Sequence, residues 1–259
     1  RRWPGMQDAA PGDLVNHLGH PNGWVRDTAQ QLLVQGRGLK VVEGLRAQAA
    51  SGRAPLGRLH ALCTLDGIGK LDVPTLEKAL KDPEAGVRRQ AVRLSAKTKP
   101  ALLAGLQDAD PSVRLELAVR ASRGVDIARL AADKDSWIAA AAMSSLDPGN
   151  VLAALEASLD SPALFAILSA QAVAWKKGGE ASAFLERYLS TAKRGDRLRL
   201  ADAWLKKVDP RKVPAAVLGV VGEAEAMAFD PSIAGELRVA AIRLLNRVPG
   251  RAEISVQKL

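Results

Sequence analysis

Residues 20–33 of the chain read HPNGWVRDTAQQLL, and the order of residue types in this stretch indicates a turn that leads directly into a helix. Asn22 and Gly23 favour the turn, and an asparagine at this point can cap the first free N–H groups of the helix. Apolar residues then recur at helical spacing after Val25, at Ala29, Leu32 and Leu33. We therefore expect Trp24 and Val25 to enter the helix and to begin one buried stripe along it.

The same order of turn, Val-Arg and apolar spacing recurs along the chain, which identifies an internal repeat. The copies read DPEAGVRRQAVRLSA (82–96), ADPSVRLELAVRAS (109–122), DKDSWIAAAAMSSL (133–146), in which Ala139 replaces the arginine, and GELRVAAIRLLNRV (235–248). Shorter amphipathic stretches such as DLVNHL, PTLEKAL, PALLAGL and DIARLA lie before the copies. A helix–turn–helix unit at intervals of roughly 25 to 40 residues is typical of helical solenoid repeats.

The composition agrees with an all-α fold. Apolar residues make up 47% of the 259 residues but aromatic residues only 3%, and the alternating runs typical of strands are missing. We predict a right-handed α-solenoid of about seven or eight helix pairs. The expected organisation is a lead-in at 1–11, the solenoid at 12–248 and a tail or linker to a following domain at 249–259. The expected pairs are 12–36, 38–66, 72–98, 99–123, 125–147, 149–178, 179–208 and 210–248.

Arginine recurs at one position of the repeat. The position is held by Arg26, Arg88, Arg114 and Arg238. A side chain there can reach the turn of the adjacent repeat, where the candidate acceptors are Asp27, Asp82, Asp110 and the turn carbonyls. We favour a structural ladder of charge-assisted hydrogen bonds that aligns the repeats. Ligand binding by the same residues, with Trp24, is the alternative, because spacing alone does not decide between them.

The repeat resembles HEAT repeats, and two longer strings resemble a more specific group. LVNHLGHPNGWVRDTAQQLL (14–33) and GRLHALCTLDGIGKLD (57–72) are similar to the HEAT segment of PVC-type membrane-bound dehydrogenases. In these exported bacterial proteins the segment accompanies a sugar-dehydrogenase-like propeller and a cytochrome c domain with a Cys-x-x-Cys-His motif. The resemblance is tight only to residue 72, and Val25 stands where the family usually has a second tryptophan. It implies a non-catalytic scaffold that contacts protein partners or neighbouring domains, and an exported or periplasmic location.

The residues themselves predict no catalytic, cofactor or metal site. The chain has no Cys-x-x-Cys-His motif and no glycine-rich phosphate loop, and it has a single cysteine, Cys63, which fits a buried hydrophobe. The histidines are His17, His20 and His60, and no carboxylate accompanies them at metal-ligand spacing. No apolar run reaches the length of a membrane span. We therefore expect no enzyme activity from this chain.

The net charge of +9 favours one alternative, a basic solenoid that binds nucleic acid. HEAT-like alkylpurine DNA glycosylases combine such a solenoid with aromatic residues and a catalytic Asp. The candidate basic face is Lys193, Arg194, Arg197, Arg199, Lys206, Lys207, Arg211 and Lys212, with Trp175 and Trp204 as candidates for base stacking. Trp204 follows Leu200 at core spacing, so we favour a solvated basic face, and nucleic-acid binding remains the less favoured function.

Overall fold

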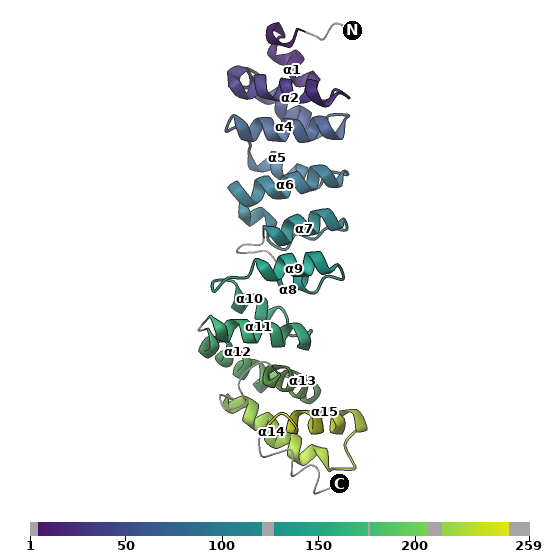
Figure 1. Ribbon diagram of the computed structural model, residues 1–259, viewed down its shortest axis with the longest axis vertical. Coiled ribbons are helices and arrows are strands. Elements are labelled where there is room, and N and C mark those ends of the chain that lie inside the picture. The colour runs from purple at the N-terminus through teal and green to yellow at the C-terminus, as the bar shows by residue number, and fades with distance from the viewer. Residues whose placement is uncertain (1–4, 121–126, 176, 207–213, 249–259) are drawn as a thin grey trace. The chain divides into compact units, whose positions relative to one another are not determined.

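Helices make up all the regular structure that the computed structural model describes, which covers residues 5–120, 127–175, 177–206 and 214–248 (Figure 1). No strand occurs in these ranges, so the predicted all-α class is confirmed. The chain divides into an N-terminal unit, Arg1–Val125, and a C-terminal unit, Asp126–Leu259, each with its own core. The predicted tail at 249–259 lies outside the described residues.

In the N-terminal unit the helices come in pairs. The elements are the 3-10 turn Met6–Asp8, α1 (Pro11–His17), α2 (Gly23–Leu32), α3 (Val42–Ser51), α4 (Pro55–Gly67), α5 (Val73–Ala79), α6 (Ala85–Thr98), the 3-10 turn Pro100–Leu103 and α7 (Pro111–Val119). A π-helical turn, Leu33–Arg37, and a 3-10 turn, Gly38–Lys40, connect α2 to α3. The first helix of a pair and the second helix of a pair thus alternate along the chain.

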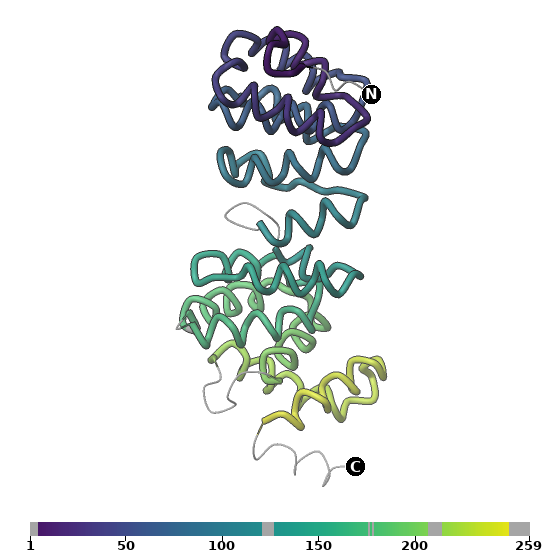
Figure 2. The backbone as a smooth tube through the Cα atoms, turned by 45° about the horizontal axis from the view of Figure 1, so that its top comes forward, coloured from purple at the N-terminus to yellow at the C-terminus, as the bar shows by residue number. Residues whose placement is uncertain are grey.

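Helices of the same kind pack against one another in this unit. The second helices α2, α4, α6 and α7 contact each other in succession, while the first helices α1, α3 and α5 contact each other beside them (Figures 1 and 2). The core lies between these two layers. Its fully buried leucines include Leu14, Leu45, Leu62 and Leu76. The apolar stripes that the helical spacing predicts therefore face each other across the two layers.

Local sequence signals set the ends of these helices. The side chains of Asn22, Asp72 and Asp110 accept the backbone N–H groups of Trp24, Thr75 and Ser112 at the starts of α2, α5 and α7. Such caps satisfy N–H groups that have no partner inside the helix. At the other end of α4, Gly69 has φ 67°, which lets the Lys70 N–H reach the Leu65 carbonyl at 2.8 Å.

One predicted helix is reduced to a single turn. We expected a full first helix in the span 99–123, but only Pro100–Leu103 is helical there, and in the 3-10 form. Pro100 cannot donate a backbone hydrogen bond, and Gly105, with φ 67°, turns the chain soon after the segment begins. The prediction of a full helix from the apolar spacing of PALLAGL is therefore wrong.

The C-terminal unit is built on the same alternation. Its helices are α8 (Ile127–Ala131), α9 (Ser136–Ser144), α10 (Val151–Glu156), α11 (Pro162–Ala174), α12 (Gly178–Thr191), α13 (Arg194–Leu205), α14 (Ala215–Ala228) and α15 (Gly235–Leu245). Within it α10, α12 and α14 contact one another in succession, as do α11, α13 and α15. The largest buried side chains are Trp204 and Phe165, whose rings lie 6.4 Å apart between α13 and α11.

Candidate interaction surfaces

Four successive second helices carry an arginine four residues after the N-cap. These are Arg26, Arg58, Arg88 and Arg114, which follow the caps Asn22, Ala54, Glu84 and Asp110. Each guanidinium donates to carbonyls of the turn that precedes its own helix. Arg88 Nη1, for example, lies 2.8 Å from the Asp82 carbonyl oxygen and 3.0 Å from that of Pro83. We call these four residues the arginine ladder, and each of them fixes its own turn to its own helix.

Two members of the ladder also bind a carboxylate in the next turn along the chain. Arg58 Nε and Nη2 lie 2.6 and 2.7 Å from the Asp82 oxygens, and Arg88 Nε and Nη2 lie 2.7 and 3.0 Å from those of Asp108. Both contacts are bidentate, the strongest geometry for such a pair. They join the second helix of one pair to the turn of the next. Arg58 and Asp108 belong to this set, and the sequence interpretation missed both.

The remaining residues of the predicted ladder have other positions. Asp110 accepts the Ser112 N–H at 2.8 Å as the cap of α7, and Asp27 is exposed and makes no hydrogen bond within the described residues. Arg26 reaches the His20 carbonyl at 2.7 Å and Nε2 of His60 at 3.3 Å. The expectation that Asp27 and Asp110 accept the ladder arginines is therefore wrong. The arginines donate instead to the turn carbonyls and to Asp82 and Asp108.

Arg114 and Arg238 complete the predicted positions. Arg114 Nη1 donates to the Ala109 carbonyl of the turn before its own helix at 2.7 Å, as the other ladder arginines do in their turns. Arg238 also follows its cap, Ala234, by four residues, but its Nε is buried and makes no hydrogen bond to a described residue. The pKa of Asp230 is lowered mainly by the hydrogen bonds from Ser232, and the charge of Arg238 adds to this effect. Arg238 thus acts on its turn through charge.

The electrostatics of the ladder favour ionised carboxylates. Burial by itself raises the pKa of Asp82, but the hydrogen bonds from Arg58 and from the Glu84 N–H outweigh it, and the resulting pKa lies below its ordinary value. Asp108 behaves in the same way, with Arg88 as the donor. A carboxylate that stays ionised while buried must keep its partner. The ladder arginines therefore have a structural role in the N-terminal unit.

Trp24 is half-exposed rather than buried. The residue retains 53% of its accessible surface, and Trp137, the second residue after the cap of α9, retains 78%. The backbone N–H of each is held at 2.9 Å by the cap, Asn22 in one helix and Asp135 in the other. The prediction that Trp24 begins the buried stripe is wrong, because the stripe starts at Val25 and the preceding residue points away from it.

We accordingly expect Trp24→Ala to lower the free energy of unfolding by about 1 kcal/mol or less, the range for a partly exposed side chain. A fully buried tryptophan would lose about 3–5 kcal/mol on the same truncation. Chemical denaturation followed by circular dichroism distinguishes the two, with Val25→Ala as the buried neighbour for comparison. A loss as large as that of a core tryptophan would show that Trp24 is packed in solution.

His60, on α4, lies between two side chains of α2, Arg26 and Gln30. Its Nε2 accepts from Arg26 and its Nδ1 lies 2.7 Å from Oε1 of Gln30, so Nδ1 carries the proton of a neutral ring. Burial lowers the pKa of His60, the charge of Arg26 lowers it further, and Asp27 partly opposes them. A proton on Nε2 would place a second donor against the guanidinium. The folded N-terminal unit therefore favours the neutral imidazole.

Acidification is expected to destabilise the N-terminal unit in consequence. The unfolded chain binds the His60 proton more tightly than the folded chain, so stability falls as the pH drops below about 6.5, the ordinary value for histidine. The ladder carboxylates add a second loss only below about pH 4. Melting temperatures measured across this range should show a slope that His60→Gln reduces. An equal slope in the wild type and in His60→Gln would contradict this assignment.

Three of the five described residues of the predicted basic face in the C-terminal unit form ion pairs within the fold. Arg197 contacts Glu223 at 2.7 Å, Lys206 contacts Asp202 at 2.9 Å, and Arg199 pairs with Asp196. Lys193 and Arg194 are exposed, and Lys207, Arg211 and Lys212 lie outside the described residues. Trp204 is 1% exposed and Trp175 is half-buried, which leaves no exposed ring for base stacking in the described part of this run. Ion pairs and burial thus weaken the case for a nucleic-acid surface here.

The side chains that are candidates for metal binding or nucleophilic chemistry make local contacts. The described residues contain no group of three His, Cys, Asp or Glu residues that could hold a metal ion. Burial raises the pKa of the Cys63 thiol and outweighs the opposing hydrogen bond that Nε2 of Gln90 donates to its sulfur at 3.3 Å, so the reactive thiolate is disfavoured. His20 uses Nδ1 to accept the Asn22 N–H at 3.0 Å. These side chains serve the local structure.

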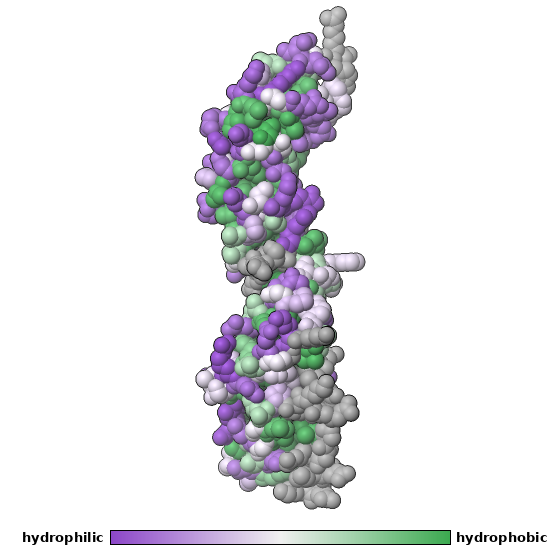
Figure 3. All heavy atoms as spheres, turned by 90° about the vertical axis from the view of Figure 1, so that its left-hand side faces the viewer, coloured by the Kyte–Doolittle hydropathy of each residue, from purple (hydrophilic) through white to green (hydrophobic). Residues whose placement is uncertain are grey.

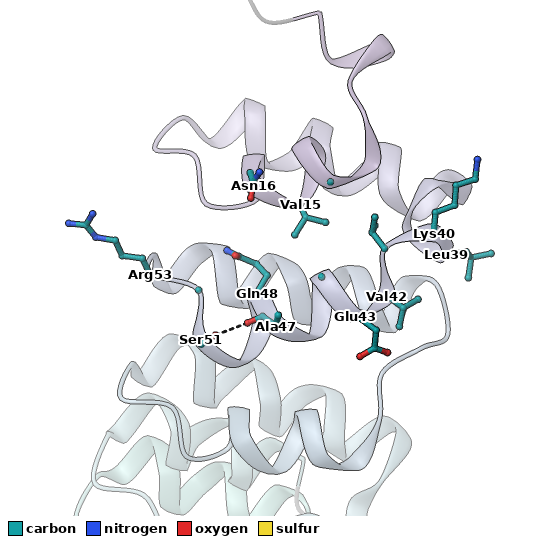
Figure 4. Close-up of a pocket in the computed structure, with 14 residues that line it drawn as sticks. Val15, Asn16, Leu39, Lys40, Val42, Glu43, Ala47, Gln48, Ser51 and Arg53 are labelled. Carbon is teal, nitrogen blue, oxygen red and sulfur yellow. Dashed lines mark hydrogen bonds between the residues drawn. The ribbon is translucent and has the colours of Figure 1, made fainter.

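A groove of about 860 Å³ runs between α1 and α3 in the N-terminal unit (Figure 4). A second hollow, of about 490 Å³, adjoins it and shares Asn16, Gln48 and Arg53 with it. Exposed apolar side chains occur elsewhere as small patches among hydrophilic ones, as one face of the molecule shows (Figure 3). The sequence interpretation did not identify the groove, because small residues rather than a motif form it.

No protein-family model, curated protein or solved structure matches the chain. The resemblance of residues 14–33 and 57–72 to the dehydrogenase-associated HEAT segment therefore stays a prediction. No helix among the described residues combines the length and the apolar composition needed to cross a membrane. The functional argument consequently rests on the surfaces described above.

Proposed function

We propose that the chain is a non-catalytic scaffold for protein–protein or interdomain contacts, built from HEAT-like helix pairs in a right-handed α-solenoid. The succession of like helices within each unit supports this proposal, as do the Arg58–Asp82 and Arg88–Asp108 contacts, which join a second helix to the next turn in the N-terminal unit. Stacked pairs of this kind bury a continuous core while they leave long rows of helix ends on the surface. Such rows are suited to contact with a folded partner.

The exposed tryptophans carry the proposal. Trp24 and Trp137 occupy the same position in α2 and α9, two residues after the cap, and the two residues are 53% and 78% exposed. Leu56 holds the equivalent position in α4 and is 49% exposed. A tryptophan that stays in water gains much free energy when a partner covers it, and tryptophan and arginine dominate the energetics of protein interfaces. The repeat thus exposes large apolar residues near the N-termini of its second helices, where a partner can contact them.

The partners that the resemblance implies are neighbouring domains of one larger exported redox protein. We propose that the segment spaces or docks a sugar-dehydrogenase-like propeller and a cytochrome c domain, and that it acts in the periplasm or outside the cell. Any oxidation would then take place in those domains.

The first test is the coding sequence on either side of the segment. The proposal expects a propeller before residue 1 and a Cys-x-x-Cys-His motif after residue 259. The separately produced domains are then titrated into the chain by calorimetry. Trp137→Ala and Trp24→Ala should each weaken binding about tenfold or more, which corresponds to about 1.4 kcal/mol of lost contact.

The control is Val239→Ala, which truncates a side chain that is also exposed, at 47%, but lies within α15 rather than two residues after a cap. It should bind as the wild type does, and circular dichroism should show that all three variants keep their helices. If the flanking sequence encodes neither domain, the proposal that the segment belongs to a larger redox protein is wrong. If the tryptophan variants bind as tightly as the wild type, Trp24 and Trp137 do not contact the partner.

A further inference from the structure

The groove between α1 and α3 has a floor of small residues with open space above it. Gly12 lies on α1 and Gly44 on α3, and a Cβ atom added at either would meet no atom within 4 Å. Ala47 and Ser51 continue the floor along α3, and Val15 contributes the apolar side chain of the opposite wall (Figure 4). The floor therefore leaves room for another chain to approach the helix backbone closely.

Two amide side chains face this space from opposite walls. Asn16 projects from α1 and Gln48 from α3 (Figure 4). Neither amide makes a hydrogen bond to another described residue. Each offers both a donor and an acceptor, which is the complement that a backbone peptide unit requires. The groove is therefore equipped to pair with an extended main chain as well as to cover apolar side chains.

The two ends of the groove are cationic. Lys40 lies at one end and Arg53 at the other, and both side chains extend outward from the rim (Figure 4). Glu43 is the one carboxylate of the lining, and Nη1 of Arg46 lies 2.5 Å from it, so the two cations at the ends outnumber it. Charge complementarity thus favours an occupant with an acidic group at each end, and the chain's net charge of +9 acts in the same direction.

The length of the groove sets the length of the occupant. α3 has 10 residues, so it spans about 15 Å at 1.5 Å per residue. An extended strand rises about 3.3 Å per residue, so roughly five residues cover the same distance. Side chains one, three and five of such a strand point to the same face, which would place the acidic groups at the ends and one apolar side chain over the floor.

We propose that the groove binds an extended acidic peptide segment of a partner protein, about five residues long, with carboxylates that pair with Lys40 and Arg53. The peptide backbone hydrogen-bonds to Asn16 and Gln48, and its central apolar side chain covers Gly44. This inference rests on the proposed scaffold function and names the chemistry of one partner segment. It concerns a surface separate from the tryptophan positions.

The probe is a fluorophore-labelled, end-blocked Glu-Ala-Val-Ala-Glu peptide, with Lys-Ala-Val-Ala-Lys as the charge-reversed control, measured by fluorescence anisotropy at low ionic strength. We expect the acidic peptide to bind about tenfold or more tightly than the basic one. The double variant Lys40→Glu/Arg53→Glu should lose that preference. Gly44→Leu, which fills the floor, should weaken binding about tenfold or more without a lower melting temperature, because leucine is the better helix former.

Two matched variants act as controls. Gly219→Leu makes the same change at an exposed glycine of α14 where a Cβ also meets no atom within 4 Å, and Lys193→Glu reverses an exposed charge in the C-terminal unit. Both should bind the acidic peptide within about twofold of the wild type. If these variants weaken binding as much as the groove variants do, or if no peptide binding occurs, the proposal is overturned.

Other occupants give distinct results. An oligothymidylate bound as tightly as the acidic peptide and equally sensitive to Gly44→Leu would assign the groove to a phosphate ligand and overturn the peptide proposal. A dimer in analytical ultracentrifugation that Gly44→Leu dissociates would assign it to a second copy of the chain, with the same consequence. Absence of peptide binding, together with binding of the flanking domains that depends on Trp137, would leave the scaffold function standing and reject only this inference.

Discussion

Arg58→Ala is expected to lower the free energy of unfolding of the N-terminal unit by about 3–5 kcal/mol. The guanidinium binds Asp82 through two hydrogen bonds of 2.6 and 2.7 Å, and the two side chains expose only 10% and 6% of their surface. Arg58 Nη1 also donates to the Gly52 carbonyl at 2.8 Å. Truncation leaves an ionised carboxylate buried without its partner, which is far more destabilising than the loss of an exposed ion pair.

Chemical denaturation at neutral pH measures this loss. Arg89→Ala removes an exposed arginine from the same row of helices and should change the stability by no more than about 0.5 kcal/mol. The double variant Arg58→Met/Asp82→Leu replaces the pair by apolar side chains and should recover most of the loss, because neither charge then remains buried. A loss below about 1 kcal/mol for Arg58→Ala would show that the pair is solvated in solution.

The importance of Arg58 explains what the sequence could and could not predict. Helical spacing, capping residues and the recurrent Val-Arg are local signals, and they located nearly all of the helices. Arg58 holds the same ladder position as Arg26 and Arg88, but Ala54 replaces the usual capping residue and Gly57 replaces the valine, so the pattern was not recognised. Counting four residues from each helix start, rather than matching Val-Arg, would have found it.

Other features depend on contacts that no local pattern contains. Whether Asp108 or Asp110 accepts Arg88 depends on which carboxylate the next turn directs toward the guanidinium, and Asp110 is committed to Ser112. Trp24 is exposed because it lies one residue before Val25, where the buried stripe begins. The groove arises from Gly12 and Gly44 on two helices that only packing brings together. Periodicity predicts elements, whereas their mutual contacts decide the surfaces.

Trp204→Ala is expected to have an effect of similar size in the C-terminal unit, about 3–5 kcal/mol. Trp204 is 1% exposed, packs 6.4 Å from Phe165 and lies on α13, which contacts both α11 and α15. Its truncation removes a large apolar surface from the centre of three helices and leaves a cavity that they fill only in part. Trp204 thus lies in the core, as the sequence predicts, and its packing holds α13 against its neighbours.

Trp204→Phe separates the ring from its N–H group. The indole Nε1 is buried and makes no hydrogen bond to a described residue, so its removal eliminates an unsatisfied donor while most of the apolar contact with Phe165 remains. We therefore expect Trp204→Phe to cost about 1 kcal/mol, well below the alanine variant. Denaturation curves of both variants, compared with Trp24→Ala, test the order. If Trp204→Ala is as mild as Trp24→Ala, the buried tryptophan does not hold α13 in the core, and an exposed stacking role for it would be open again.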